Sequence, residues 1–99
     1  MYSYYFSILN SQNSDLMQDF EIKAVVLRKM LMHRWIGGKH TAIENMPKGF
    51  PQHERGRVAD LTKELIKEGF IILKPTGYGE HVSLNPRRVS EAKRLAGMA

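Results

Sequence analysis

The sequence predicts a mainly α protein with one small β-hairpin, an α+β fold, built as a single domain of residues 1–99. Two observations lead to this prediction. Between residues 52 and 68, apolar residues recur with the spacing of one helical face, at Val58, Leu61, Leu65 and Ile66. Gly69 then suits a helix end, and two short apolar stretches, near residues 70–74 and 80–84, flank a Pro/Gly turn.

The N-terminal third is expected to hold an extended segment and then a long helix. Residues 1–13 are rich in aromatic side chains and suit an arm or strand, either folded on its own domain or reaching a second subunit. Residues 14–36 fit one long helix, capped by Ser14 or Asp15. Gly37-Gly38 is expected to end it.

Two shorter helices are predicted, one before helix 52–68 and one after the hairpin. Thr41 suits the cap of a helix over residues 42–46, with Glu44 at the third position of a capping box. Asn85-Pro86 suits the start of a C-terminal helix over residues 85–97.

The sequence RVADLTKELIKEGFI (Arg57–Ile71), followed by a turn and HVSLNP (His81–Pro86), resembles the recognition helix, wing and exit of the winged helix-turn-helix DNA-binding superfamily. It looks most like small, uncharacterised archaeal members. The resemblance covers residues 37–97 and implies that residues 37–84 form the helix-turn-helix plus wing. It also implies a transcriptional regulator whose helix 52–68 reads the major groove of double-stranded DNA.

The exposed face of helix 52–68 is the first candidate for DNA contact. Gln52 suits an adenine edge, Arg57 a guanine edge and Asp60 a cytosine amine. Lysines further along the helix suit phosphates, and a glycine lets the backbone approach closely. The alternative for each residue is an ordinary solvated position on an amphipathic helix. The residues expected to contact DNA here are Gln52, His53, Arg55, Gly56, Arg57, Asp60, Lys63 and Lys67.

Two further sites are candidates for contacts with the sugar-phosphate backbone. The hairpin tip offers a cation, a hydroxyl and an aromatic ring, at Lys74, Thr76 and Tyr78. The start of the short helix offers free N–H groups beside Lys39, His40 and Thr41. The alternatives are a hairpin loop with no ligand and simple capping by Thr41.

Composition favours a polyanionic partner and gives no sign of catalysis. The net charge is +5. The chain has no cysteine, and its four histidines lack a metal-binding spacing, so we expect no metal site and no cofactor. No nucleophile or phosphate-loop motif occurs, so we do not expect an enzyme. No signal peptide or membrane span is predicted, and we expect a cytoplasmic protein.

The long helix 14–36 is apolar on two faces, and each face needs a cover. One face is expected to meet the core, through Leu16, Phe20, Ala24, Leu27 and Leu31. The opposite face, interrupted by Lys29, is the predicted interface of a homodimer, through Ile22, Val25, Met32 and Ile36. The alternative is that the terminal segments cover this second face within one chain.

Two other classes of function remain open. A winged helix can also serve as a protein–protein interaction or assembly module, and the nearly balanced charge of helix 52–68 is compatible with that role. Binding to DNA that weakens as salt rises would distinguish the DNA-binding regulator from the interaction module. A nucleic-acid-processing enzyme, or a subunit of one, would need a cluster of acidic or histidine side chains that the sequence does not display.

Overall fold

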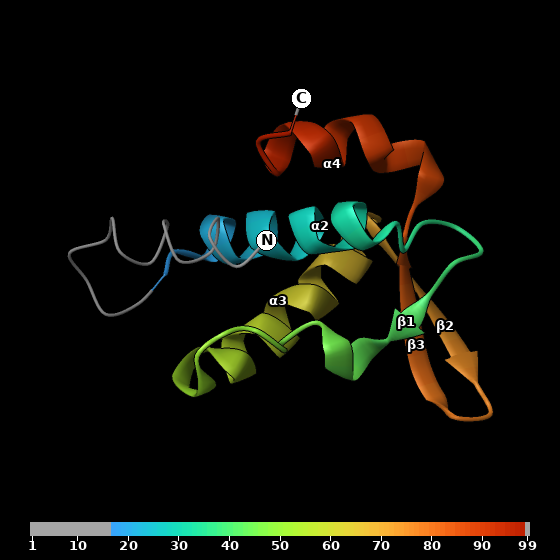
Figure 1. Ribbon diagram of the computed structural model, residues 1–99, viewed down its shortest axis with the longest axis horizontal. Coiled ribbons are helices and arrows are strands. Elements are labelled where there is room, and N and C mark those ends of the chain that lie inside the picture. The colour runs from blue at the N-terminus through green and yellow to red at the C-terminus, as the bar shows by residue number, and fades with distance from the viewer. Residues whose placement is uncertain (1–16, 99) are drawn as a thin grey trace.

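The computed structural model describes residues 17–98, and these residues form three α-helices and one three-stranded antiparallel sheet (Figure 1). Three single 3-10 turns accompany them, at Ile43–Asn45, Gln52–Glu54 and Pro86–Arg88. The predicted α+β class is therefore confirmed, and the element order is compatible with a winged-helix-like layout. The elements in chain order are α2 (Asp19–His33), β1 (Thr41–Ala42), α3 (Arg55–Lys67), β2 (Ile71–Thr76), β3 (Gly79–Leu84) and α4 (Val89–Leu95).

The sheet has the order β1-β3-β2, so the second hairpin strand is central. In the hairpin, Ile71 lies opposite Leu84 and Thr76 opposite Gly79. The predicted strands are thus confirmed, and toward the tip β2 extends two residues and β3 one residue further than predicted, because the turn is tight. Strand β1 was not predicted; it pairs Thr41 with Val82 on the other side of β3.

The predicted short helix over residues 42–46 is wrong. Thr41 and Ala42 are a strand, and only one 3-10 turn follows them. Thr41 is buried, and its hydroxyl accepts a hydrogen bond from the Asn45 amide at 2.7 Å. Backbone pairing with β3 therefore replaces helix capping, because it satisfies the Thr41 backbone and buries a β-branched side chain.

The long first helix is shorter than predicted at both described ends. It begins after its N-cap Gln18, whose N–H donates to the Glu21 carboxylate at 2.7 Å. The expected caps, Ser14 and Asp15, lie outside the described residues. It ends at Arg34, which adopts a left-handed conformation (φ 58°), before Gly37 is reached. The early end follows from the sheet, because Ile36 forms a parallel bridge with Leu84. The N-terminal arm, residues 1–13, and Leu16 lie outside the described residues.

The two other predicted helices are present. Helix 52–68 is a 3-10 turn continued by α3, and it ends where Gly69 adopts φ 86° and Phe70 N–H bonds to the Leu65 carbonyl. The C-terminal helix starts as expected, since the Asn85 side chain accepts a hydrogen bond from Arg87 N–H. Its helical part ends at Leu95, two residues before the predicted end.

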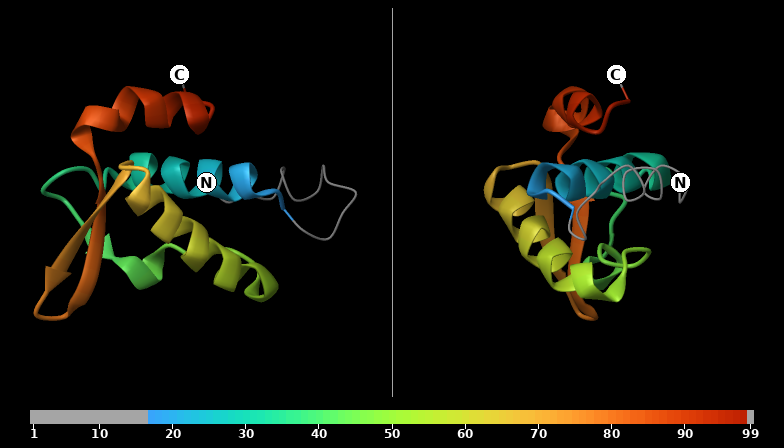
Figure 2. Two further views of the ribbon diagram at one scale, coloured as in Figure 1. Left: turned by 180° about the vertical axis from the view of Figure 1, so that it is seen from behind. Right: turned by 90° about the vertical axis from the view of Figure 1, so that its left-hand side faces the viewer.

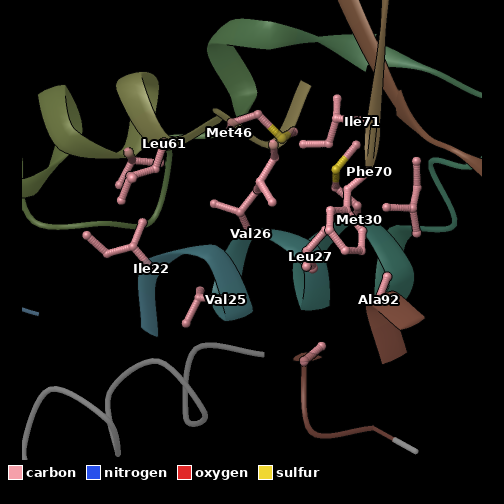
Figure 3. Close-up of a cluster of buried hydrophobic side chains, with 14 of the residues drawn as sticks. Ile22, Val25, Val26, Leu27, Met30, Met46, Leu61, Phe70, Ile71 and Ala92 are labelled. Carbon is pink, nitrogen blue, oxygen red and sulfur yellow. The ribbon is translucent and has the colours of Figure 1, made fainter. Parts of the chain in front are cut away.

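Helix α2 is the central layer of the molecule, with α3 on one side and α4 on the other (Figures 1 and 2). Its apolar side chains form one core with those of α3, α4 and the start of the hairpin (Figure 3). Met30, Leu61, Phe70, Ile71 and Ala92 belong to this core. This arrangement explains why α2 is apolar on two faces: a helix packed on two sides needs both.

The predicted dimer stripe is largely covered within the single chain. Ile22 is fully buried and Val25 is 8% exposed, both in the core, and Ile36 packs partly against it. Only Met32 is exposed. The stripe is therefore not available as an interface. Phe20, expected in the core, is instead 71% exposed.

Candidate nucleic-acid interface

The outer face of α3 and its 3-10 turn carries most of the polar side chains expected to contact DNA. The opposite face of the helix enters the core through Val58, Leu61, Thr62 and Leu65. Helical periodicity then turns the remaining positions to solvent. Glu64 and Glu68 are also exposed, but they pair with Lys23 on the flank that faces α2. The other exposed residues, which we call the outer face, are Gln52, His53, Arg55, Gly56, Asp60, Lys63 and Lys67.

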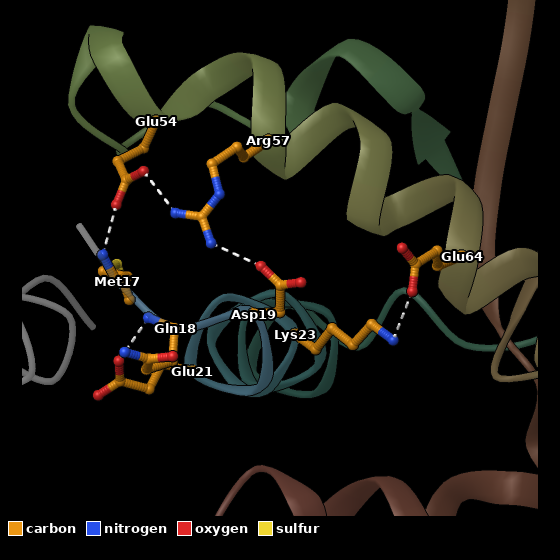
Figure 4. A network of polar contacts seen from close by, with 8 residues as sticks. All are labelled: Met17, Gln18, Asp19, Glu21, Lys23, Glu54, Arg57 and Glu64. Carbon is orange, nitrogen blue, oxygen red and sulfur yellow. Dashed lines mark hydrogen bonds and ion pairs between the residues drawn. The ribbon is translucent and has the colours of Figure 1, made fainter.

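Arg57 does not belong to this outer face. Its guanidinium donates from Nη1 to Glu54 Oε1 at 2.9 Å and from Nη2 to Asp19 Oδ1 at 2.5 Å (Figure 4). These bonds raise the pKa of Arg57, chiefly through Asp19, against the opposing effect of burial. Arg57 therefore connects α3 to the start of α2, and its guanidinium is engaged within the chain in this conformation. Its contact with a guanine stays a prediction.

Glu54 is the buried partner in this network. Its side chain is fully inaccessible to solvent, and its second oxygen accepts a hydrogen bond from Met17 N–H at 2.9 Å. A buried carboxylate needs such partners. Glu54 could not be separated by sequence from the other acidic residues of the helix, because its burial arises from contact with a distant segment.

Lys23 of α2 binds two more acidic residues of α3. Its ammonium lies 3.0 Å from Glu64 and 3.1 Å from Glu68. Burial lowers the pKa of Lys23, but the hydrogen bonds to the two carboxylates outweigh burial and leave it raised. Three of the four acidic residues around α3 are thus held on the flank that faces α2. The outer face keeps one acidic residue, Asp60, beside its cations.

A buried lysine fixes the loop that precedes α3. Lys29 is 9% exposed, and its ammonium donates to the carbonyls of Asn45, Met46 and Lys48. Burial, together with the nearby charge of Lys48, lowers the pKa of Lys29 to about 8. Sequence reasoning treated Lys29 only as an interruption of an apolar face. That interruption was the available signal, because a lone lysine among core positions must find polar partners.

The hairpin tip presents two of its three expected side chains to solvent. Lys74 is exposed, and Tyr78 is 97% exposed. Thr76 is used locally: its hydroxyl accepts from Tyr78 N–H at 3.0 Å and donates to the Gly79 carbonyl at 2.7 Å. Thr76 therefore closes the turn, and its hydroxyl is not free for a phosphate.

The third group of residues expected to contact DNA, Lys39, His40 and Thr41, does not form one exposed site. Thr41 is buried in β1, and no helix starts there. The Nδ1 atoms of His40 and His81 lie 2.9 Å apart, so one ring donates to the other and ties the loop to β3. Lys39 alone is exposed.

The outer face and the hairpin tip lie on the same side of the molecule. Both α3 and the hairpin extend from α2 in the direction away from α4 (Figures 1 and 2). Exposed cations occur on both elements, at Lys63 and Lys67 of α3 and at Lys74 of β2.

Among residues 17–98, no group of three histidine, aspartate or glutamate side chains lies close enough together to hold a metal ion. No helix in this part of the chain is both long and apolar enough to cross a membrane.

Comparison of the chain with protein-family models, with curated proteins and with solved structures gave no significant match. Function is therefore inferred from the residues of this chain alone.

Proposed function

We propose that this protein binds double-stranded DNA as a winged-helix protein and acts as a transcriptional regulator. In this proposal the N-terminal half of α3 enters the major groove, where Gln52, His53 and Arg55 meet base edges. Lys63 and Lys67 meet phosphates, and Lys74 and Tyr78 of the hairpin contact the backbone of the adjoining groove.

The observation that carries the proposal is the separation of charge around α3. The bonds of Arg57 and Lys23 retain Glu54, Glu64 and Glu68 on the flank that faces α2. The helix is nearly balanced in sequence, but its outer face is predominantly basic. A basic, hydrogen-bonding helix face beside an exposed hairpin supports binding to a duplex, whose phosphates dominate affinity.

A second candidate, a protein–protein interaction module, is favoured by the apolar side chains of the hairpin. Ile72 is 41% exposed and Leu73 is 36% exposed, both on β2, which is an edge strand of the sheet. An exposed edge strand with apolar side chains suits pairing with a strand of another protein.

Selection from a pool of randomised duplexes tests the proposal. If α3 reads bases, repeated rounds with the full chain enrich a short common sequence, and the enriched duplex binds more tightly than random duplex at the same salt. Enrichment of no sequence, with no binding to random duplex even at low salt, would leave the interaction module as the better account.

A further inference from the structure

Two histidine rings from distant parts of the chain meet on the sheet. His40 lies directly before β1, and His81 lies on β3, 41 residues further along the chain. Their Nδ1 atoms are 2.9 Å apart, and the rings meet edge to face, with centroids 4.9 Å apart and planes 72° apart. Both residues are partly buried. Sequence spacing does not reveal such a pair, because only the strand pairing brings the two rings together.

The strand pairing holds the two rings on one face of the sheet. His81 is paired on both sides, with Ala42 of β1 and Lys74 of β2 opposite it. Side chains alternate between the two faces of a strand, so His40, two residues before Ala42, lies on the same face as Ala42 and His81. Diagonal neighbours on one face are within reach of long or aromatic side chains. The sheet therefore fixes the backbone of both histidines where their rings converge.

We propose that His40 and His81 together bind a divalent transition-metal ion of the zinc type through their two Nδ1 atoms. Imidazole nitrogen is a favoured ligand of zinc, copper and nickel. Two nitrogens that bind one ion at about 2.0–2.1 Å, with an angle of about 90° to about 110° at the ion, are about 2.9–3.4 Å apart. The observed distance of 2.9 Å lies within this range. The inference does not depend on DNA binding.

Metal binding replaces the hydrogen bond between the rings. In the neutral pair one Nδ1 donates to the other. A bound ion needs a lone pair on both Nδ1 atoms, so the donor ring changes tautomer and carries its proton on Nε2. Both rings then turn so that their lone pairs converge on the ion. The proton stays on the protein, and the ion takes its place between the rings.

Water and one lysine set the strength of this site. Within the described part of the chain no third histidine, aspartate or glutamate joins the pair, so water completes the coordination, as it does at open zinc sites. Lys74 is exposed and lies opposite His81 on β2. Its ammonium repels a cation on this face of the sheet. Removal of the Lys74 charge should therefore tighten metal binding.

The first test is calorimetric titration of the full chain with Zn²⁺ alone. The wild type should bind one ion per chain. His40→Gln and His81→Gln should each weaken binding by at least about tenfold, which is the lower limit for changes that disturb the surroundings of a bound metal. His33→Gln is the matched control, because His33 is an exposed histidine that stacks on Trp35, and it should bind Zn²⁺ as the wild type does.

Lys74→Met keeps both rings and should bind Zn²⁺ more tightly than the wild type. This variant decides the matter if circular dichroism shows that a histidine variant has lost its fold, and unchanged affinity in Lys74→Met would then contradict the site. A wild type that does not bind Zn²⁺ would overturn the proposal. An equal loss of binding in His33→Gln would overturn it as well, because the ion would bind elsewhere.

The second test uses the wild type, so no substitution can disturb folding. Nitrogen-15 NMR of the imidazole rings distinguishes Nδ1 from Nε2, and a bound Zn²⁺ shifts the signal of the nitrogen that it contacts. We expect Zn²⁺ to shift the Nδ1 signals of His40 and His81 and to leave those of His33 and His53 unchanged. Shifts confined to His33 or His53, or no shift at all, would refute the site.

Discussion

Arg57 and Glu54 form an ion pair of 2.9 Å in which the carboxylate is fully buried and the guanidinium is 33% exposed. The same guanidinium reaches Asp19 at the start of α2. One arginine thus joins the first turn of α3 to the first turn of the helix that runs through the centre of the protein. Its function in this conformation is to fix the position of α3, and the outer face beside it makes the proposed contacts with DNA.

Arg57→Ala should therefore lower stability. The substitution leaves the buried Glu54 carboxylate with the Met17 N–H as its remaining partner. An under-satisfied buried group costs about 1–3 kcal/mol of unfolding free energy, which urea denaturation can measure. Lys63→Ala is the control, since Lys63 is exposed on the same helix. Unchanged stability together with relaxed DNA specificity would restore the base-reading role expected from the sequence.

Stability should rise with pH above neutrality because of Lys29. Burial and the charge of Lys48 lower the pKa of Lys29 to about 8, from 10.5 in the unfolded chain. Between these two values the unfolded state binds more protons, so the free energy of unfolding increases with pH. We expect wild type to gain stability relative to Lys29→Met between about pH 7 and about pH 10, by at most about 3 kcal/mol. A difference independent of pH would show that Lys29 titrates normally.

Gly56→Ala should separate stability from binding. Apart from the adjoining residues and the backbone of the helix itself, no atom lies within 4 Å of the position that a Cβ on Gly56 would occupy, and the backbone is helical. Alanine should therefore stabilise the helix by up to about 1 kcal/mol. If DNA approaches the backbone here, the added methyl group should weaken duplex binding at the same time. Increased stability with unchanged affinity would remove Gly56 from the interface.

Tyr78→Ala should change binding and leave folding intact. The side chain is 97% exposed, so its loss should alter the free energy of unfolding by less than about 0.5 kcal/mol. We expect weaker binding to duplex, measured by fluorescence anisotropy. Thr76→Val is the structural comparison, because it removes both hydrogen bonds that close the turn. If Tyr78→Ala binds duplex as wild type does, the hairpin is better assigned to a protein partner.

The elements with strong local signals could be predicted from sequence. Apolar periodicity identified α3, and Gly69 with the Pro/Gly turn identified the hairpin, because helix spacing and positive φ are local properties. The exposed positions of α3 followed from the same periodicity.

The errors arose where distant segments decide the local structure. Thr41 has a plausible capping sequence, but pairing with Val82 makes it a strand residue. Arg57 and Lys63 were both expected on the exposed face of the helix, and only contact with Asp19 and Glu54 sets Arg57 apart. Likewise, the two apolar faces of α2 were recognised, but which of their side chains are covered within the chain depends on where α3 and α4 pack. Ile22 was assigned to a dimer interface and Phe20 to the core, whereas Ile22 is fully buried within the chain and Phe20 is 71% exposed.

The central claim is that the outer face of α3 binds the phosphates of a duplex. The salt dependence of binding to random-sequence DNA tests it most directly, with Lys63→Ala compared with Lys93→Ala. Both lysines are exposed, but Lys93 lies on α4, on the other side of α2. We expect wild-type affinity to fall steeply as salt rises, and Lys63→Ala, but not Lys93→Ala, to reduce the slope of log K against log salt by about 1. Binding that does not depend on salt, or equal slopes for Lys63→Ala and wild type, would contradict the claim.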